Sequence, residues 1–151
     1  MRGPIATTLA GVLALALAGC GGGTTTVADT RADTARLDPC AGAPADAGFV
    51  FVSVPRPGDP VASGFTLLGC ARSFEGNVPW RLLDAGGRVI ARGAATGGSV
   101  DGPAPFSARV AYAVGEAQVG MLEVSEDDPS GGEGRPPVRN VIPVQLAATG
   151  P

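Results

Sequence analysis

The side chains that could do chemistry in this 151-residue chain are mainly carboxylates, arginines and three cysteines. The chain has no histidine and, read along its length, no lysine, so all 11 basic residues are arginine. These absences exclude a Ser-His-Asp triad, a Cys-His pair, a histidine-ligated zinc ion, a Schiff-base lysine and a P-loop. A formal net charge of −3 and an aromatic content of 5% also argue against a nucleic-acid partner.

The acidic residues would allow two kinds of chemistry, calcium binding and glycoside hydrolysis. Calcium accepts carboxylate oxygens, but the spacing of the acids does not match an EF-hand loop, so we favour a solvated acidic loop. Two carboxylates can also hydrolyse a glycosidic bond, but nothing in the sequence predicts the cleft that would separate and tune them. We therefore expect no catalytic residue, no metal and no cofactor. The acidic loop comprises Glu123, Glu126, Asp127, Asp128 and Glu133.

Arginines recur in or beside the apolar segments of the chain. Such a set would suit an anionic ligand, but arginines on strands most often extend into solvent, and we favour that interpretation. Arg72, Glu75 and Arg81 are the candidate binding residues, on an exposed sheet face or strand edge. The full set is Arg72, Arg81, Arg88, Arg92 and Arg109.

Two aromatic residues have a structural and a functional interpretation. Phe74, with Glu75, would mark a binding edge, but we favour a Phe74 that packs under a turn beside a Glu75 that pairs with an arginine or accepts a backbone N–H. Trp80 would offer a stacking platform for a ligand. Its alternation with Val78 and Leu82 instead predicts a core position.

The first twenty residues have the pattern of an export signal. Met1 and Arg2 precede an uncharged apolar stretch that is too short for a comfortable membrane span and suits a signal peptide. The stretch ends in Leu-Ala-Gly-Cys at positions 17–20, which resembles the lipobox of bacterial lipoproteins. The resemblance implies that residues 1–19 are removed and that Cys20 is acylated. An ordinary secretory signal with a chance cysteine is the alternative.

The two remaining cysteines are expected to pair. Lipidation of Cys20 leaves an even number in an oxidising compartment, which predicts a disulfide between Cys40 and Cys70. The alternative is two free thiols, with Cys70 covered by apolar neighbours. Residues 20–47 are otherwise interpreted as a lipid-anchored linker, with a Gly/Thr-rich start typical of a flexible tether.

The rest of the chain predicts short strands separated by turns. Apolar and β-branched residues alternate over strand-length segments, and Gly and Pro lie between them. About 100 residues can bury one core of two sheets, so we expect an all-β, immunoglobulin-like antiparallel β-sandwich of about seven strands over residues 48–148. The expected strands are 49–54, 65–72, 78–83, 88–91, 106–112, 118–125 and 138–146.

The segment 65–78 resembles the central motif of the immunoglobulin-like domain found in bacterial spore germination proteins. An apolar strand is followed by Gly-x-Ala at 69–71 and by Phe-Glu at 74–75. The resemblance extends over about residues 49–146 and implies an immunoglobulin-like sandwich, of a kind generally taken as a binding or adhesion module, in an exported protein. Cys70 and the acidic loop depart from the family pattern, and no second germination-type domain accompanies this one.

Together these features predict a lipid-anchored binding or adaptor module of the cell envelope. The domain would lie outside the cytoplasm and be held to the bacterial cell membrane through acylated Cys20. Its partner would be an envelope protein or polymer that the sequence does not identify. The alternative function is an envelope hydrolase that uses carboxylates alone.

Overall fold

A computed structural model describes residues 38–128, 133 and 136–150 of the chain. Eight strands run through these residues, and no helix of the described part is long and apolar enough to cross a membrane. Cys20 and the predicted signal peptide lie outside the described residues. The strands are β1 (Phe49–Val54), β2 (Pro60–Val61), β3 (Phe65–Arg72), β4 (Asn77–Leu83), β5 (Val89–Thr96), β6 (Ala104–Val110), β7 (Gln118–Ser125) and β8 (Arg139–Leu146).

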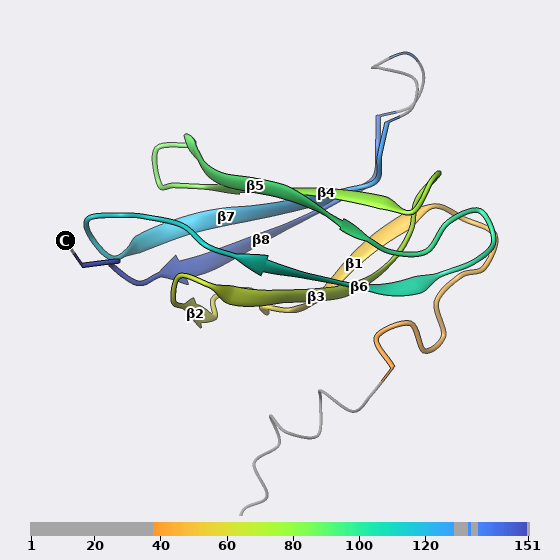
Figure 1. The fold of residues 1–151 in the computed structure, drawn as a ribbon, viewed down its shortest axis with the longest axis horizontal. Helices are drawn as coiled ribbons and strands as arrows, with labels where there is room; N and C mark the ends of the chain where they lie inside the picture. Colours follow the sequence, from red (N-terminus) through yellow and green to blue (C-terminus); the bar gives the residue numbers. More distant parts are fainter. Residues whose placement is uncertain (1–37, 129–132, 134–135, 151) are drawn as a thin grey trace, which may run out of the picture.

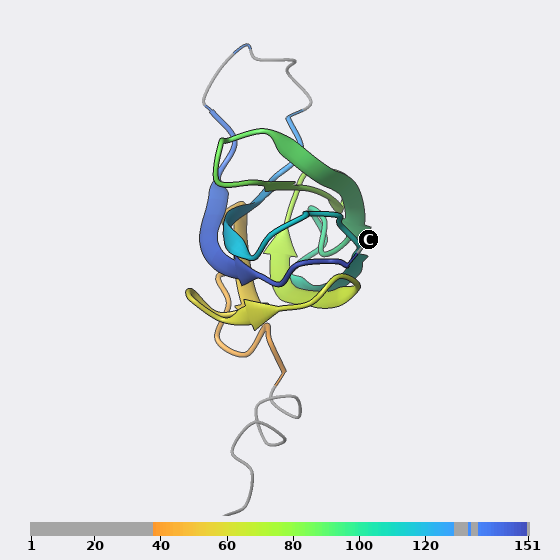
Figure 2. The ribbon, with the colours of Figure 1, turned by 90° about the vertical axis from the view of Figure 1, so that its left-hand side faces the viewer.

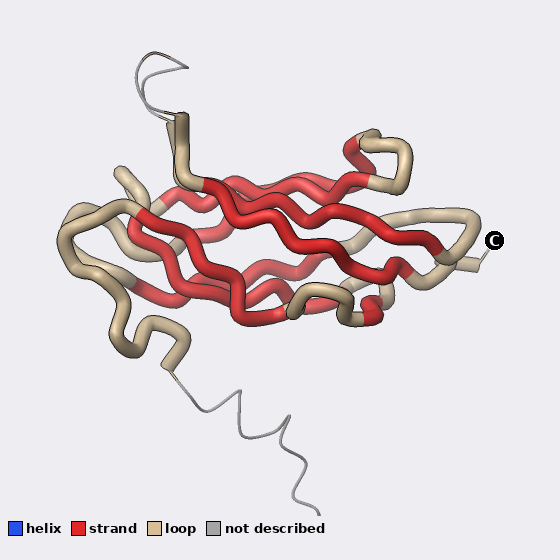
Figure 3. The backbone as a smooth tube through the Cα atoms, turned by 180° about the vertical axis from the view of Figure 1, so that it is seen from behind, coloured by secondary structure: helices blue, strands red, loops and turns tan. Residues whose placement is uncertain are grey.

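The strands form the two layers of a β-sandwich (Figure 1). The smaller sheet has the strand order β1-β3-β6, and the larger has the order β2-β8-β7-β4-β5. All pairs are antiparallel except β2 with β8. Seen end-on, the two sheets enclose one core, and seen from behind, loops join the strands at both ends of the molecule (Figures 2 and 3). The predicted all-β immunoglobulin-like sandwich is confirmed.

The core is formed by the inward-facing residues of both sheets. Along β4 the residues alternate between buried and accessible positions, with Val78, Trp80 and Leu82 facing inward. Trp80 is 9% exposed, so its predicted core position is confirmed. Leucines of four strands are fully buried and interlock the two layers: Leu67, Leu82, Leu122 and Leu146.

β5 is twice as long as the four-residue strand that the sequence predicts. It pairs with β4 from Leu83 opposite Val89 to Asn77 opposite Thr96. Its second half is Gly-Ala-Ala-Thr, which has no apolar alternation and therefore gave no strand signal. Gly93 is required there, because a Cβ at that position would lie 2.5 Å from Cζ2 of Trp80.

β2 was not predicted from the sequence, because it lies in the Gly- and Pro-containing stretch between the expected strands 49–54 and 65–72. It consists of two residues that pair in parallel with Gln145 and Leu146 of β8. The pairing is made by Gln145 N–H, which donates to Asp59 O over 2.9 Å, and by Ala147 N–H, which donates to Val61 O over 3.0 Å. Two residues are too few to show a period, so the sandwich has eight strands where about seven were expected.

The β4–β5 hairpin is closed by Asp84. Its Oδ1 accepts hydrogen bonds from the backbone N–H groups of Gly86 (3.0 Å) and Arg88 (2.9 Å), and its Oδ2 accepts one from Arg88 Nε (3.1 Å). The backbone N–H of Arg88 is the main reason that the pKa of Asp84 lies below its ordinary value of 3.8. The closed turn fixes the register that places Arg92 opposite Arg81.

The predicted disulfide between Cys40 and Cys70 is present, with the two Cα atoms 5.2 Å apart. Cys70 lies opposite Phe51 of β1 and Pro105 of β6, on the face of the smaller sheet that points away from the core. It is nevertheless only 1% exposed, because the incoming chain lies against it. Part of the segment interpreted as a linker is therefore held on the outer face of the smaller sheet (Figure 1).

Candidate binding groove

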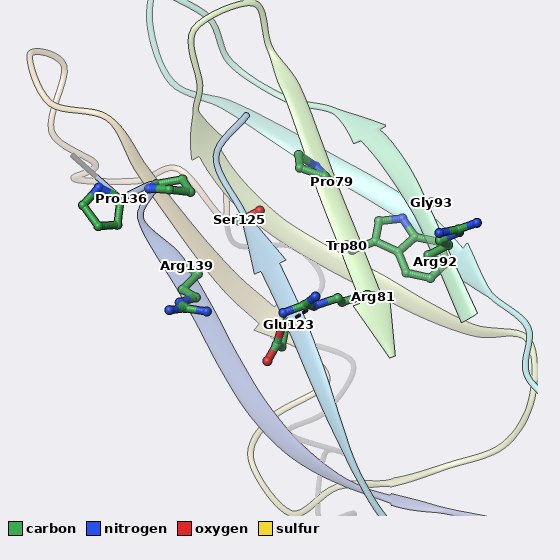
Figure 4. Close-up of a pocket in the computed structure, with 10 residues that line it drawn as sticks. Pro79, Trp80, Arg81, Arg92, Gly93, Glu123, Ser125, Pro136 and Arg139 are labelled. Carbon is green, nitrogen blue, oxygen red and sulfur yellow. Dashed lines mark hydrogen bonds and ion pairs between the residues drawn. The ribbon is translucent and has the colours of Figure 1, made fainter. Parts of the chain in front are cut away.

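The outer face of the larger sheet carries a groove of about 650 Å³. Residues from β4, β5, β7 and β8 line it, together with Pro136 and Pro137 of the segment that leads into β8. Because the even-numbered residues of β4 are buried, Pro79 and Arg81 face outward into this groove. We call it the arginine groove, and Figure 4 shows its residues.

Strand register sets the charges of the groove in a row. Arg81 lies directly opposite Arg92 of β5 on one side and Glu123 of β7 on the other. Two like charges opposite each other are unfavourable, and the Glu123 carboxylate offsets this repulsion by forming an ion pair with Nε of Arg81. The pair is only partly shielded from water, with the Arg81 side chain 51% exposed.

Arg139 supplies the third guanidinium from the opposite side of the groove. It begins β8 and lies opposite Ser125 of β7, two residues along the strand from Glu123. In the described part of the chain, neither Arg92 nor Arg139 forms an ion pair or a side-chain hydrogen bond. Among the described residues that line the groove, three arginines and one glutamate give a net charge of +2, whereas the net charge of the whole chain is −3.

Trp80 and Gly93 form the floor of the groove between the arginines (Figure 4). The indole ring lies against the backbone of Gly93, which has no side chain to keep it away. Trp80 is therefore packed below the groove and offers no open ring face to a ligand. Its Nε1 is buried and has no hydrogen-bond partner among the described residues.

The structure does not bring the three predicted binding residues together. Arg81 lies in the arginine groove, whereas Arg72 ends β3 in the other sheet. The Arg72 guanidinium donates through Nη2 to Val100 O over 3.0 Å and lines a separate cavity of about 340 Å³. Glu75 is exposed in the turn before β4, and no hydrogen bond or ion pair of Glu75 is found within the described part of the chain.

The sequence predicted that Phe74 packs under the turn, but in the structure it does not. Its side chain is 55% exposed. The turn that contains Phe74 bends sharply at Gly76, which has a φ of +73°. The backbone N–H of Gly76 donates to Ser73 O over 3.5 Å. Ser73 is the residue of this turn that points inward, at 3% exposure. The favoured interpretation of Phe74 was wrong because the serine, not the aromatic ring, fills the space beneath the turn.

The acidic loop is not uniformly solvated, which corrects a second expectation. Glu126 is 7% exposed, and its Oε2 accepts the backbone N–H of Val138 over 2.9 Å. The backbone N–H of Glu126 in turn donates to Val138 O over 2.9 Å. These two hydrogen bonds hold the start of the loop, at Glu126, against its end, at Val138. No group of three or more His, Cys, Asp or Glu side chains in the described residues is arranged to hold a metal ion.

Arg139 is the charged groove residue that was not singled out from the sequence, and the adjacent Pro136 and Pro137 were not singled out either. Arg92 and Arg81 were already in the set of strand arginines. Arg139 had a usable signal, since Ile142, Val144 and Leu146 define the inner face of β8 and odd-numbered residues must face outward. What the sequence lacked was the pairing of β4 with β7, which joins strands about 40 residues apart.

Comparison with known proteins places the chain in a family. A search of curated proteins returned no match. Among solved structures, the chain is similar to CopC from Methylosinus trichosporium OB3b, with 16% identity and a TM-score of 0.43 over 70% of this chain and 98% of that one. The family model of the immunoglobulin-like domain of bacterial spore germination matches residues 49–133, more than half of the chain. This chain belongs to that family of immunoglobulin-like domains.

Proposed function

We propose that the chain is a lipid-anchored binding module of the bacterial cell envelope and that the arginine groove is its ligand site. The observation that carries this proposal is the excess of positive charge in the groove. Arg92 and Arg139 have no ion-pair partner among the described residues, and the protein as a whole is acidic. Unpaired guanidinium groups gathered beside an apolar floor are groups that a ligand can satisfy.

The envelope location rests on three features of the chain. The first twenty residues have the pattern of a lipoprotein signal that ends at Cys20. The Cys40–Cys70 disulfide suits an oxidising compartment outside the cytoplasm. The chain also belongs to a family described from bacterial spore germination. Acylation of Cys20 would hold the domain at the membrane, and the bilayer is then its first partner.

Binding fits the groove better than catalysis does. The groove holds no thiol, and the chain has neither histidine nor lysine to act as a base beside Ser125. Among the described residues that line the groove, the carboxylate is that of Glu123, which forms an ion pair with Arg81. Acid–base catalysis by two carboxylates would need a second one beside it, which is why we favour binding.

Sedimentation with envelope fractions tests the proposal. The mature chain that begins at residue 20, made lipid-free by Cys20→Ser, is mixed with cell wall and membrane fractions of its own bacterium. We expect saturable binding to one fraction and its loss in the double variant Arg92→Glu with Arg139→Glu. Arg92→Glu and Arg139→Glu are also measured singly against Arg56→Glu, which makes the same change in net charge at an exposed residue outside the arginine groove.

Two results would contradict the proposal. The first is binding that the double variant retains in full. The second is turnover of an envelope polysaccharide or peptide that stops when a single Asp or Glu is replaced, which would instead support the hydrolase.

A further inference from the structure

We infer that the arginine groove takes a linear polymer that carries repeated oxyanion groups, either carboxylates or phosphates. The inference rests on the proposed function and names the ligand class for that site. Arg92 and Arg139 are the residues that would contact separate anionic groups of one polymer chain. Arg81 is paired with Glu123 and would contribute chiefly to the positive electrostatic potential between Arg92 and Arg139.

The chemistry follows from the guanidinium group. A guanidinium presents several N–H donors in a plane and matches a carboxylate or a phosphate with two parallel hydrogen bonds. The groove adds rigid apolar walls, the rings of Pro79, Pro136 and Pro137, against which the uncharged part of a repeating unit can pack.

The spacing of the two unpaired arginines favours a polymer over a single small anion. β8 and β5 are three strand spacings apart in the larger sheet, which is about 14 Å. Arg139 is also displaced by two residues along the strand from the row that holds Arg92, roughly 7 Å. Figure 4 shows these two side chains on opposite sides of the Arg81–Glu123 pair. Anionic groups repeated along a chain can meet both arginines at once.

Charge and orientation argue against the other occupants. The centre of a protein–protein interface is usually depleted of glutamate and aspartate, although arginine is common there, whereas the Arg81–Glu123 ion pair lies across the middle of this groove. A membrane surface is also disfavoured. The chain from the predicted lipid anchor is fixed by Cys40 to the outer face of the smaller sheet, and the arginine groove lies on the outer face of the larger one.

Calorimetric titration of the lipid-free mature chain tests the ligand class. The probes are polygalacturonate as the carboxylate polymer, poly(glycerol phosphate) as the phosphate polymer, and dextran as the neutral polymer. Monomeric galacturonate and glycerol phosphate test whether one anion suffices. Vesicles of equimolar phosphatidylcholine and phosphatidylglycerol test the membrane surface.

We expect one of the two polyanions to bind saturably, and we expect dextran not to bind. The affinity for the polyanion should decrease as salt is added, because salt screens the charges. Each single variant, Arg92→Glu or Arg139→Glu, should weaken binding by about tenfold or more, because each removes a charge-assisted contact. Arg56→Glu makes the same change in net charge and should change the affinity by less than about twofold, since long-range charge effects are screened. The matching monomer should bind far more weakly than the polymer.

Each contrary outcome has a distinct meaning. If neither polyanion binds while envelope binding still needs Arg92 and Arg139, the ligand class is wrong and the proposed function stands. If a polyanion binds equally well to both arginine variants, or if Arg56→Glu weakens it as much, the groove is not the polyanion site. If the vesicles bind more tightly than either polymer, or the monomer binds as tightly, the polymer is not the occupant.

Discussion

Replacing Cys40 with serine tests how much the domain depends on its disulfide. The Cys40–Cys70 bridge closes a loop with a sequence separation of 30. In the chain-entropy model a loop of that size contributes about 3–4 kcal/mol, mainly by restricting the unfolded chain. Domains of this size are commonly stable by only about 5–15 kcal/mol, so the loss would be a large share of the total. Cys70 would remain as a small, weakly polar side chain, which adds no strong unsatisfied group.

Urea unfolding followed by tryptophan fluorescence measures this loss. Trp80 is the only tryptophan of the chain and is 9% exposed in the folded core, so its emission reports global unfolding. The comparison uses the mature chain with Cys20→Ser, with and without Cys40→Ser. The free energy of unfolding should fall by about 3–4 kcal/mol. In a thermal scan of the same two proteins the melting temperature should fall by roughly 15 °C, at about 4 °C per kcal/mol for a domain near 100 residues.

Reduction provides the control for the substitution itself. The parent chain treated with a thiol reductant should lose the same stability as the Cys40→Ser variant, and the variant should not respond to the reductant. A loss below about 1 kcal/mol would refute the loop-closure reasoning. It would mean that the unfolded chain between these cysteines is already restricted without the bridge.

Three further predictions concern the anchor, the floor of the groove and the alkaline limit of stability. Cys20→Ser should move the expressed protein from the detergent phase to the aqueous phase, and unchanged partitioning would contradict lipidation. Gly93→Val should cost about 1–3 kcal/mol and shift Trp80 emission, because any Cβ there lies 2.5 Å from the indole; an unaltered spectrum would refute the packing. Burial raises the pKa of Tyr112 above its ordinary value of 10.0. The contribution of Tyr112 to the free energy of unfolding is therefore fully present below pH 10 and is lost as the pH rises through the folded-state pKa. In urea titrations over this range the decline should be absent from Tyr112→Phe, and its persistence there would assign it to another group.

The fold could be predicted from sequence wherever side chains alternate. β1, β3 and β7 have the predicted bounds, since each has a half-buried pattern with a period of two. Side-chain alternation carries no signal where backbone contacts decide whether a strand forms. The second half of β5 is built from small residues that leave room for Trp80, and two-residue β2 forms only because β8 is already in place beside it.

The candidate site was predicted only in part, for a similar reason. Arg81 and Arg92 could be recognised as outward-facing strand residues, but a sequence without the strand order does not say which arginines become neighbours. Arg72 and Arg81 seemed equivalent along the chain and lie in different sheets. Glu126 seemed to be one acid among several until the fold showed that its carboxylate holds the backbone of Val138.

The disulfide also determines how mechanical load enters the domain. β1 is an edge strand whose backbone ladder, among the described strands, is made with β3, and its Val52 N–H also donates to Oδ1 of Asn140 in β8 over 3.2 Å. Tension applied at Phe49 would therefore open the β1–β3 ladder one hydrogen bond at a time. With the bridge in place, tension on the chain before Cys40 passes through Cys70 into β3, which is paired on both sides. Displacing β3 requires its bonds to both β1 and β6 to shear together. A domain pulled by a wall-bound ligand against a membrane anchor would therefore resist in shear, with its edge strand carrying little of the force.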